Sequence, residues 1–140
     1  MSHSHNERLH GDLTRQLSYF EKETKELLRK VYPDMSKRDE MQKLLDSYTD
    51  HIRLFQAGSI AGDTDSLVWI GSSVTIQDEI DRLDETYKIV MPHEVNVDLG
   101  HISFLSPLGS KLLLARKDNR IEVESPSGSY EVIIMNVSRS

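Results

Sequence analysis

Two stretches in the first part of the chain carry apolar residues at helical spacing. From Leu9 to Val31 the steps between apolar positions are three or four residues, with Thr24 as a polar interruption, and similar steps run from Met41 to Phe55. A stripe of this kind lies along one face of an α-helix and is close to the seven-residue period of a coiled coil. The pattern predicts two helices of similar length. Asn6 and Asp12 are both suitable N-caps for the first helix, so its start is open.

A short polar turn separates the two stripes. Pro33 cannot continue the first helix, so the helix is expected to end before it. We predict a length of about 25 residues, which corresponds to roughly 37 Å. Ser36 is expected to cap the second helix, with Asp39 at its third position as in a capping box. Helices joined by so short a turn run antiparallel. Residues 1–57 are therefore predicted to form a helical hairpin, a coiled coil whose tip is at about 32–39.

The spacing of the apolar residues changes after residue 57. Residues 58–66 are rich in Gly, Asp and Ser and read as a linker. In residues 67–140 apolar positions alternate as in β-strands, and Ser106 followed by Pro107 predicts the start of one short helix. The last strand has apolar residues on both faces, so we expect both faces to be buried or nearly so. The fold class predicted is α+β, a helical hairpin followed by a small antiparallel sheet domain with one helix.

Charge and composition restrict the function. Residues 1–57 carry 10 Lys/Arg and 10 Asp/Glu, whereas residues 58–140 carry 7 and 13, so the net charge of −6 lies in the second part. Because nucleic-acid binding requires a basic face, we expect no sequence-specific DNA binding and favour a protein partner. The chain has no cysteine, no apolar run long enough to cross a membrane and no apolar signal segment at its start. These features predict a cytoplasmic protein.

Several sequence motifs follow one another in the second part of the chain. The most distinctive is Ile102–Gly109, and the other blocks are Ile70–Thr75, Glu85–Val90, Ile121–Gly128 and Tyr130–Val132. In this order they resemble the C-terminal domain of the GreA/GreB transcription elongation factors, whose ISYLSPLG signature corresponds to Ile102–Gly109. The resemblance covers about residues 68–137. It departs from the family at Lys117-Asp118-Asn119, where Val-Gly-Asp is usual, which alters a turn. The chain is also similar to the shorter nucleoside-diphosphate-kinase regulator, Rnk.

The resemblance implies a specific partner and architecture. Family members have a helical hairpin and a C-terminal domain of FKBP-like fold, which docks on the rim of the secondary channel of bacterial RNA polymerase. Their hairpin enters the channel, where acidic tip residues help to hold a second Mg²⁺ and the polymerase cleaves backtracked RNA. The chain itself would not be an enzyme; at most it stimulates cleavage by the polymerase. A monomer without an intrinsic cofactor is expected.

The docking surface suggested by the resemblance is Ser106, Pro107, Leu108 and Gly109. A rigid proline and an apolar leucine at a loop-to-helix junction can present an apolar knob to a partner helix. The alternative is purely structural: Pro107 starts a helix and Leu108 packs in the core. Both interpretations stay open on the sequence.

The tip offers Asp34, Asp39 and Glu40 as acidic candidates. Two carboxylates with substrate phosphate and water suffice for Mg²⁺, so Asp34 and Asp39 are candidate ligands for an ion shared with the polymerase. However, the DxxEN pattern of cleavage-stimulating relatives is absent, and Lys37 and Arg38 would oppose a metal site. The alternative is a cleavage-silent competitor for the channel, as expected from the similarity to Rnk.

Two further alternatives belong to other classes. An FKBP-like fold raises the possibility of a prolyl isomerase, which needs an apolar pocket lined by aromatic residues; shared fold alone is a weak argument for it. The aromatic residues available for such a pocket are Trp69, Tyr87, Phe104 and Tyr130. A self-assembling coiled-coil adaptor is the other alternative, and a sedimentation measurement separates it from a monomer.

Overall fold

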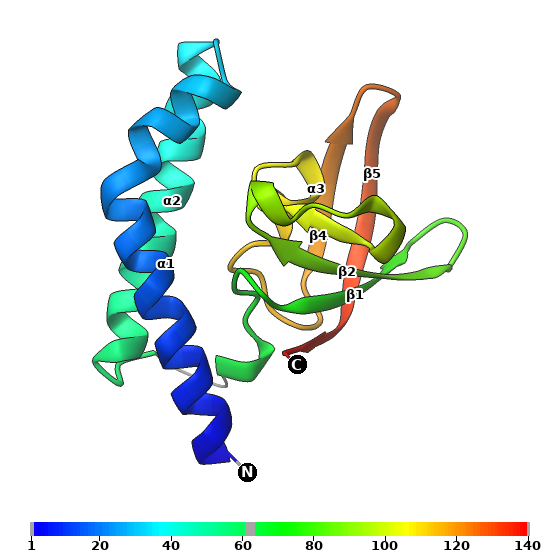
Figure 1. Ribbon diagram of the computed structural model, residues 1–140. Helices are drawn as coiled ribbons and strands as arrows, with labels where there is room; N and C mark the ends of the chain where they lie inside the picture. Colours follow the sequence, from blue (N-terminus) through cyan, green and yellow to red (C-terminus); the bar gives the residue numbers. More distant parts are fainter. Residues whose placement is uncertain (1, 61–63, 140) are drawn as a thin grey trace. The chain divides into compact units, whose positions relative to one another are not determined.

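The computed structural model describes residues 2–60 and 64–139, with side chains from residue 7 onward. The chain divides into two compact units, Met1–Ala61 and Gly62–Ser140, each of which is described by itself (Figure 1). Part of the predicted linker, residues 61–63, lies outside the described residues. No helix in 2–60 or 64–139 is long and apolar enough to cross a membrane.

The first unit is the predicted antiparallel helical hairpin, formed by α1 (Ser2–Val31) and α2 (Met35–Gln56). The first helix has 30 residues and therefore spans about 45 Å. Neither Asn6 nor Asp12 is its N-cap, since both lie inside the helix. Both candidate caps are therefore ruled out. A start at Asp12 fails because a helix whose apolar face is packed continues past one glycine, which costs only about 1 kcal/mol.

A row of buried apolar side chains fills the space between the two helices. Along α1 the buried row ends at Leu28 rather than at Leu27, and Val31 at the end of the stripe is 43% exposed. A straight helix has 3.6 residues per turn, so a strict seven-residue stripe drifts off the contact over several turns. The buried members of the row are Leu9, Leu13, Phe20, Leu28, Met41, Leu45, Tyr48 and Ile52.

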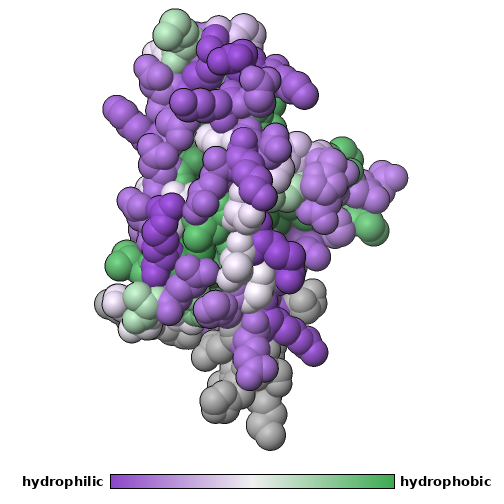
Figure 2. Space-filling model, turned by 60° about the vertical axis from the view of Figure 1, so that its left-hand side comes forward, coloured by the Kyte–Doolittle hydropathy of each residue, from purple (hydrophilic) through white to green (hydrophobic). Residues whose placement is uncertain are grey.

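Polar contacts also fix the register of the hairpin. The Tyr48 hydroxyl donates to Gln16 Oε1 at 2.5 Å, and the ring of Tyr48 meets that of Phe20 edge to face at 5.9 Å. A second contact between the helices joins Arg53 and Glu21, whose Nη2 and Oε1 atoms lie 3.5 Å apart. Outward positions are mostly charged, and Figure 2 shows hydrophilic side chains over much of the visible hairpin surface. The buried hydroxyl, paired across the helices, disfavours sliding of one helix along the other.

The second unit is a five-stranded sheet with one α-helix. The order of the strands is β3-β2-β1-β5-β4. The strands are β1 (Ser73–Asp78), β2 (Asp84–Val90), β3 (His101–Ser103), β4 (Arg120–Ser125) and β5 (Gly128–Ser138), and the helix is α3 (Pro107–Leu112). Short 3₁₀ turns lie at Thr64–Ser66, Pro92–Glu94 and Val97–Leu99. The α+β class is confirmed.

One strand pair differs from the predicted antiparallel sheet. β3 pairs with β2 in parallel, through Ile89 opposite Ile102, so the sheet is mixed. The chain between these strands makes two 3₁₀ turns and returns to the same end of the sheet, which allows the parallel direction. Alternation of apolar residues predicts strands but not their directions.

The two faces of β5 are not equally buried. Val132 and Ile134 are buried, whereas Met135 is 40% exposed. The pairing with β1 skips Met135, since Thr75 is opposite Asn136 and Ile76 is opposite Ile134. A bulge of this kind changes which side chains face the core. The prediction of a strand buried on both faces was therefore wrong.

The departure from the family's Val-Gly-Asp turn has a visible consequence. Asp118 stands where the family usually has glycine, and its backbone has φ 74°. Asparagine and aspartate tolerate this left-handed conformation better than most residues. The turn is held by Asn119, whose Oδ1 accepts from Arg116 N at 2.9 Å. The turn is therefore formed with Asp118, whose backbone is more strained in this left-handed conformation than that of a glycine would be.

Candidate functional site

The hairpin tip is closed by an aspartate cap. Asp34 has extended backbone angles, φ −77° and ψ 120°, and its Oδ1 accepts a hydrogen bond from Ser36 N at 2.9 Å. A side-chain oxygen at this position satisfies one of the unpaired N–H groups in the first turn of a helix. The prediction that Ser36 caps α2 was wrong because Asp34, directly after Pro33, is an equally good cap and begins the helix two residues earlier.

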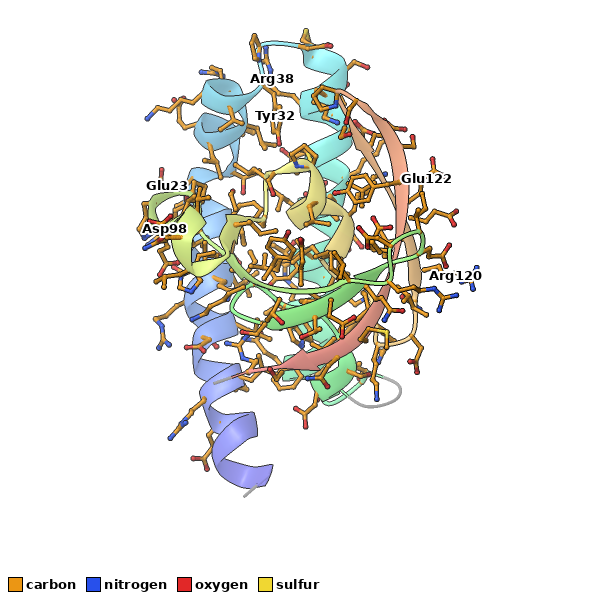
Figure 3. All side chains as sticks on the ribbon, turned by 90° about the vertical axis from the view of Figure 1, so that its right-hand side faces the viewer. Glu23, Tyr32, Arg38, Asp98, Arg120 and Glu122 are labelled. Carbon is orange, nitrogen blue, oxygen red and sulfur yellow. The ribbon has the colours of Figure 1, made fainter. Side chains whose placement is uncertain are left out.

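Arg38 binds the turn from inside the second helix. Its Nε donates to the carbonyl of Tyr32 at 2.7 Å, and its Nη2 donates to the carbonyl of Pro33 at 2.8 Å. Figure 3 shows the labelled Tyr32 and Arg38 together at the tip of the hairpin. A guanidinium that bridges two successive carbonyls restrains the turn, because its donors are held in a rigid fork. The sequence had suggested only that the charge of Arg38 opposes a metal.

The three acidic candidates at the tip have different surroundings. Asp34 is the cap, and Glu40 Oε2 lies 3.3 Å from Lys37 Nζ. Burial, followed by the charge of Glu40, raises the pKa of Tyr32. Asp39 is exposed on the first turns of α2. In the part of the chain that the structure describes, no group of three His, Asp or Glu side chains could hold a metal ion. Metal binding by Asp34 and Asp39 stays a prediction that requires further ligands from a partner.

The junction before α3 is built around Ser106. Its Oγ accepts from Gly109 N at 3.0 Å and donates to the carbonyl of Ser103 at 2.7 Å. Pro107 follows at the first helical position, where its lack of an N–H costs nothing, and it is exposed. The predicted cap and helix start are confirmed.

Gly109 lies where no other residue fits. A Cβ atom on this glycine would stand 2.1 Å from the carbonyl oxygen of Ser103 and 2.9 Å from Ser106 Oγ. The first of these neighbours is backbone and cannot rotate away. The close contact between the start of α3 and the end of β3 therefore explains why the motif requires glycine at this position.

Leu108 is half-buried and lines a small cavity of about 90 Å³. The cavity is also lined by side chains from β1, β2, β5 and the β1–β2 turn, namely Ile76, Asp78, Asp81, Leu83, Glu85, Tyr87, Tyr130 and Val132. We name this feature the acidic recess. Leu108 therefore has one side on the domain and another facing an opening, so the structural and the docking interpretations of Leu108 are compatible.

Two tyrosines in the recess keep their protons at neutral pH. Burial raises the pKa of Tyr87 to about 12, and Glu85 adds to this by accepting the hydroxyl hydrogen bond and by its charge. Burial also raises the pKa of Tyr130, with further contributions from the charges of Glu85 and Asp78. Both hydroxyls remain neutral, so the carboxylates determine the charge of the recess.

Comparison with known proteins identifies the family. The sequence profile described as "Transcription elongation factor, GreA/GreB, C-term" matches residues 63–139, more than half of the chain. The chain belongs to the GreA/GreB family. As a GreA/GreB-family protein it shares 35% identity over 95 residues with the transcription elongation factor GreA of Rhodospirillum rubrum, which covers 66% of this chain and 59% of that relative. The chain thus spans less than two thirds of that GreA factor.

Two other matches extend to the hairpin. GreA of Novosphingobium aromaticivorans is 30% identical over 131 residues, which cover 93% of this chain and 74% of the relative. The crystal structure of Thermus aquaticus Gfh1 covers 97% of this chain and 93% of its own, with 18% identity and a TM-score of 0.50. The second match concerns the fold alone. A hairpin followed by a sheet domain is therefore shared with GreA/GreB-type proteins over nearly the whole chain.

The aromatic residues considered for a prolyl isomerase do not gather around a pocket. Trp69 is 1% exposed and Phe104 is fully buried, so both belong to the core. Only Tyr87 and Tyr130 line the acidic recess, which is much smaller than the roughly 300–1,000 Å³ typical of ligand pockets. No observation in residues 64–139 favours the isomerase alternative.

Proposed function

We propose that this chain binds bacterial RNA polymerase at the rim of its secondary channel through the junction Ser106–Gly109. The proposal is supported by the family match over residues 63–139 and by the geometry of the junction. Pro107 is exposed, Leu108 is half-buried, and the backbone beneath them is held by Ser106 and Gly109. A short apolar projection on a rigid base loses little conformational entropy when it binds.

For the hairpin, we propose that α1 and α2 enter the channel without delivering a metal ion. The tip supports this version because Asp34 caps a helix and Glu40 pairs with Lys37. Arg38 places a further positive charge on the turn. These cations reduce the affinity of the tip for Mg²⁺. The chain would then compete for the channel and slow or reset transcription without cleavage of RNA.

Binding is tested with purified core polymerase and fluorescently labelled full-length chain. We expect saturable binding, and a loss of about tenfold or more in affinity for the double variant Pro107→Ala/Leu108→Asp, since a buried apolar anchor at an interface is worth about 2 kcal/mol or more. The matched control is Val97→Asp, because Val97 is 84% exposed in the same unit and lies outside the junction. Unchanged circular dichroism establishes that the double variant is folded. Equal binding of the double variant and the control rejects the junction as the docking site.

The role of the tip is tested on stalled, backtracked transcription complexes with Mg²⁺. The wild-type chain should leave the RNA length unchanged and should inhibit cleavage stimulated by an added GreA factor. If the wild-type chain shortens the RNA, the proposal of a cleavage-silent competitor is contradicted. If the Asp39→Asn variant then fails to shorten the RNA, the metal ion is assigned to the hairpin tip. A Lys43→Gln variant on the exposed face of α2 serves as the control for a change of one charge.

A further inference from the structure

The acidic recess combines apolar walls with a negatively charged opening. Ile76 and Val132 are buried at its base, and Tyr87, Tyr130 and Leu108 are half-buried around it. Leu83 in the β1–β2 turn is 64% exposed at the same opening. The three other residues that line the recess are all acidic, namely Asp78, Asp81 and Glu85. No Lys, Arg or His side chain lines the recess.

The size of the recess restricts what can occupy it. A volume of about 90 Å³ is too small for a cofactor or a metabolite, whose sites take roughly 300 Å³ or more. It is comparable to the end of one side chain. An occupant with an apolar stem and a positive head matches both the walls and the charge.

The carboxylates are held in place and still have oxygens that face solvent. Asp78 Oδ1 accepts from Ile80 N at 2.8 Å, and Asp81 Oδ1 accepts from Leu83 N at 3.0 Å, so the turn fixes both groups. Among the described residues these three carboxylates take part in no ion pair. Arg82 lies in the same turn with φ 61° but does not line the recess.

We infer that the acidic recess receives an arginine or lysine side chain that RNA polymerase presents beside the Leu108 contact. The inference rests on the proposed function and extends it, since it names a charged side chain of the partner and the pocket that selects it. The tyrosine rings contact the stem and the cation, as aromatic faces do with guanidinium groups. The carboxylates supply charge complementarity, which increases the association rate and suppresses wrong partners.

The first test is the charge-removing variant Asp81→Asn/Glu85→Gln in the full-length chain. Each amide keeps the acceptor oxygen used by Leu83 N or by the Tyr87 hydroxyl, so the fold is retained. The matched control is Asp98→Asn/Glu124→Gln, which removes the same charge from exposed positions of the same unit outside the recess. We expect core polymerase to bind the recess variant about tenfold more weakly than the control at about 0.1 M salt. The difference should shrink at about 0.5 M salt, where charges are screened.

The outcomes separate this inference from the proposed function. Tight binding of the wild-type chain with equal affinities of the two variants overturns the recess but leaves docking at the junction intact. Absence of any binding by the wild-type chain overturns both the proposed function and the polymerase as the source of the side chain.

A second test examines the recess without polymerase. N-acetyl-arginine amide is titrated into the labelled chain and followed by amide chemical shifts, with N-acetyl-citrulline amide as the neutral probe of similar shape. We expect shifts at Leu83, Tyr87, Leu108 and Tyr130 with the arginine probe only, and a loss of these shifts in Asp81→Asn/Glu85→Gln. Equal shifts with both probes, or shifts elsewhere only, contradict a recess that selects a cation.

Discussion

The hairpin tip and the Ser106–Gly109 junction are both chain reversals that start a helix beside a proline. At the tip the cap is Asp34 and the bond to Ser36 N is exposed. At the junction the cap is Ser106, and Gly109 is buried against the carbonyl of Ser103. The junction is fixed by packing as well as by hydrogen bonds, whereas the cap and the bonds of Arg38 at the tip lie at exposed or part-buried positions.

This difference separates two kinds of information in the chain. A Cβ at Gly109 would disturb β3 and α3, and the junction lies inside the segment that matches the GreA/GreB family. At the tip, residues 33–37 are all exposed, so packing restricts them less. The region that we propose as the docking site is therefore easier to infer from sequence than the hairpin tip.

The largest effect is expected for Gly109→Ala. The new Cβ would be 2.1 Å from a backbone oxygen, so α3 must move away from β3. Overpacking that displaces backbone costs about 3 kcal/mol or more, which we expect to appear as a large decrease in the urea midpoint of the second unit.

Gly11→Ala is the contrasting change in the hairpin. Its Cβ would meet only the end of the Arg15 side chain, at 3.7 Å. Because alanine is the better helix former, this variant should stabilise the hairpin by about 0.5–1 kcal/mol. A decrease in stability for Gly11→Ala, or none for Gly109→Ala, would show that the steric comparison between the two regions is mistaken.

The two caps should also differ in strength. Ser106→Ala removes one accepted and one donated hydrogen bond at a part-buried site and should cost about 2 kcal/mol, whereas Asp34→Ala should cost about 1 kcal/mol. Ser36→Ala should be nearly neutral, since Ser36 contributes only its backbone N–H to the cap. Thermal unfolding followed by circular dichroism measures all three. A larger loss of stability for Ser36→Ala than for Asp34→Ala would show that Ser36, and not Asp34, caps α2.

Arg38→Ala is expected to loosen the tip rather than unfold the hairpin. The guanidinium bonds to the carbonyls of Tyr32 and Pro33 are partly exposed, so their loss should cost only about 1 kcal/mol. Hydrogen exchange of the amides in residues 32–38 should accelerate, while Tyr48 and Ile52 in the buried core of the hairpin stay protected. Lys37→Ala is the control, because Lys37 makes only an exposed ion pair with Glu40. Equal rates of hydrogen exchange in Arg38→Ala and Lys37→Ala would show that Arg38 does not restrain the turn more than Lys37 does.

The smallest expected effect on stability concerns the neighbouring carboxylates of Glu79 and Glu131 in the sheet domain. The pKa of Glu131 is raised by a side-chain hydrogen bond with Glu79, which protonated Glu131 donates, and by the negative charge of Glu79. Arg120 Nε lies 3.2 Å from Glu79 Oε1. Figure 3 labels Arg120 beside Glu122 on β4. Because the pKa in the folded chain is raised, stability is greatest below the unfolded pKa of about 4.3 and decreases as the pH rises through the folded value.

Glu131→Gln should therefore be slightly more stable than wild type at about pH 7, because it keeps a hydrogen-bonding group without the charge. The two should become equal at about pH 3, where Glu131 is protonated because its pKa is raised. Chemical unfolding at the two pH values measures this, with Glu124→Gln as the control. A gain that persists at low pH would assign the effect to something other than charge repulsion.

Much of the fold follows from local patterns in the sequence. The apolar stripes predicted the hairpin, and Ser106 followed by Pro107 predicted the start of α3. The parallel β2–β3 pair and the bulge at Met135 were not predicted, since both depend on how the chain returns to the sheet. Alternation along one strand carries no information about its neighbour.

The candidate site was predicted in part. Ser36 and Asp34 are both good caps, and propensity alone does not decide between them. The contacts of Arg38 with two carbonyls and the acidic recess were missed because they join residues that are distant in sequence or use backbone groups. One available signal was the three acidic residues Asp78, Asp81 and Glu85 in and beside the turn between two strands.

Photo-crosslinking from position 108 tests the central proposal most directly. A photoreactive phenylalanine replaces Leu108 in one variant and Glu124, which is exposed on β4 and outside the recess, in another. Both are irradiated with core RNA polymerase, and crosslinked peptides are identified by mass spectrometry. The account predicts crosslinks to the rim of the secondary channel from position 108 and none from position 124. Crosslinks from position 124 alone, or none from position 108 to any polymerase peptide, would contradict it.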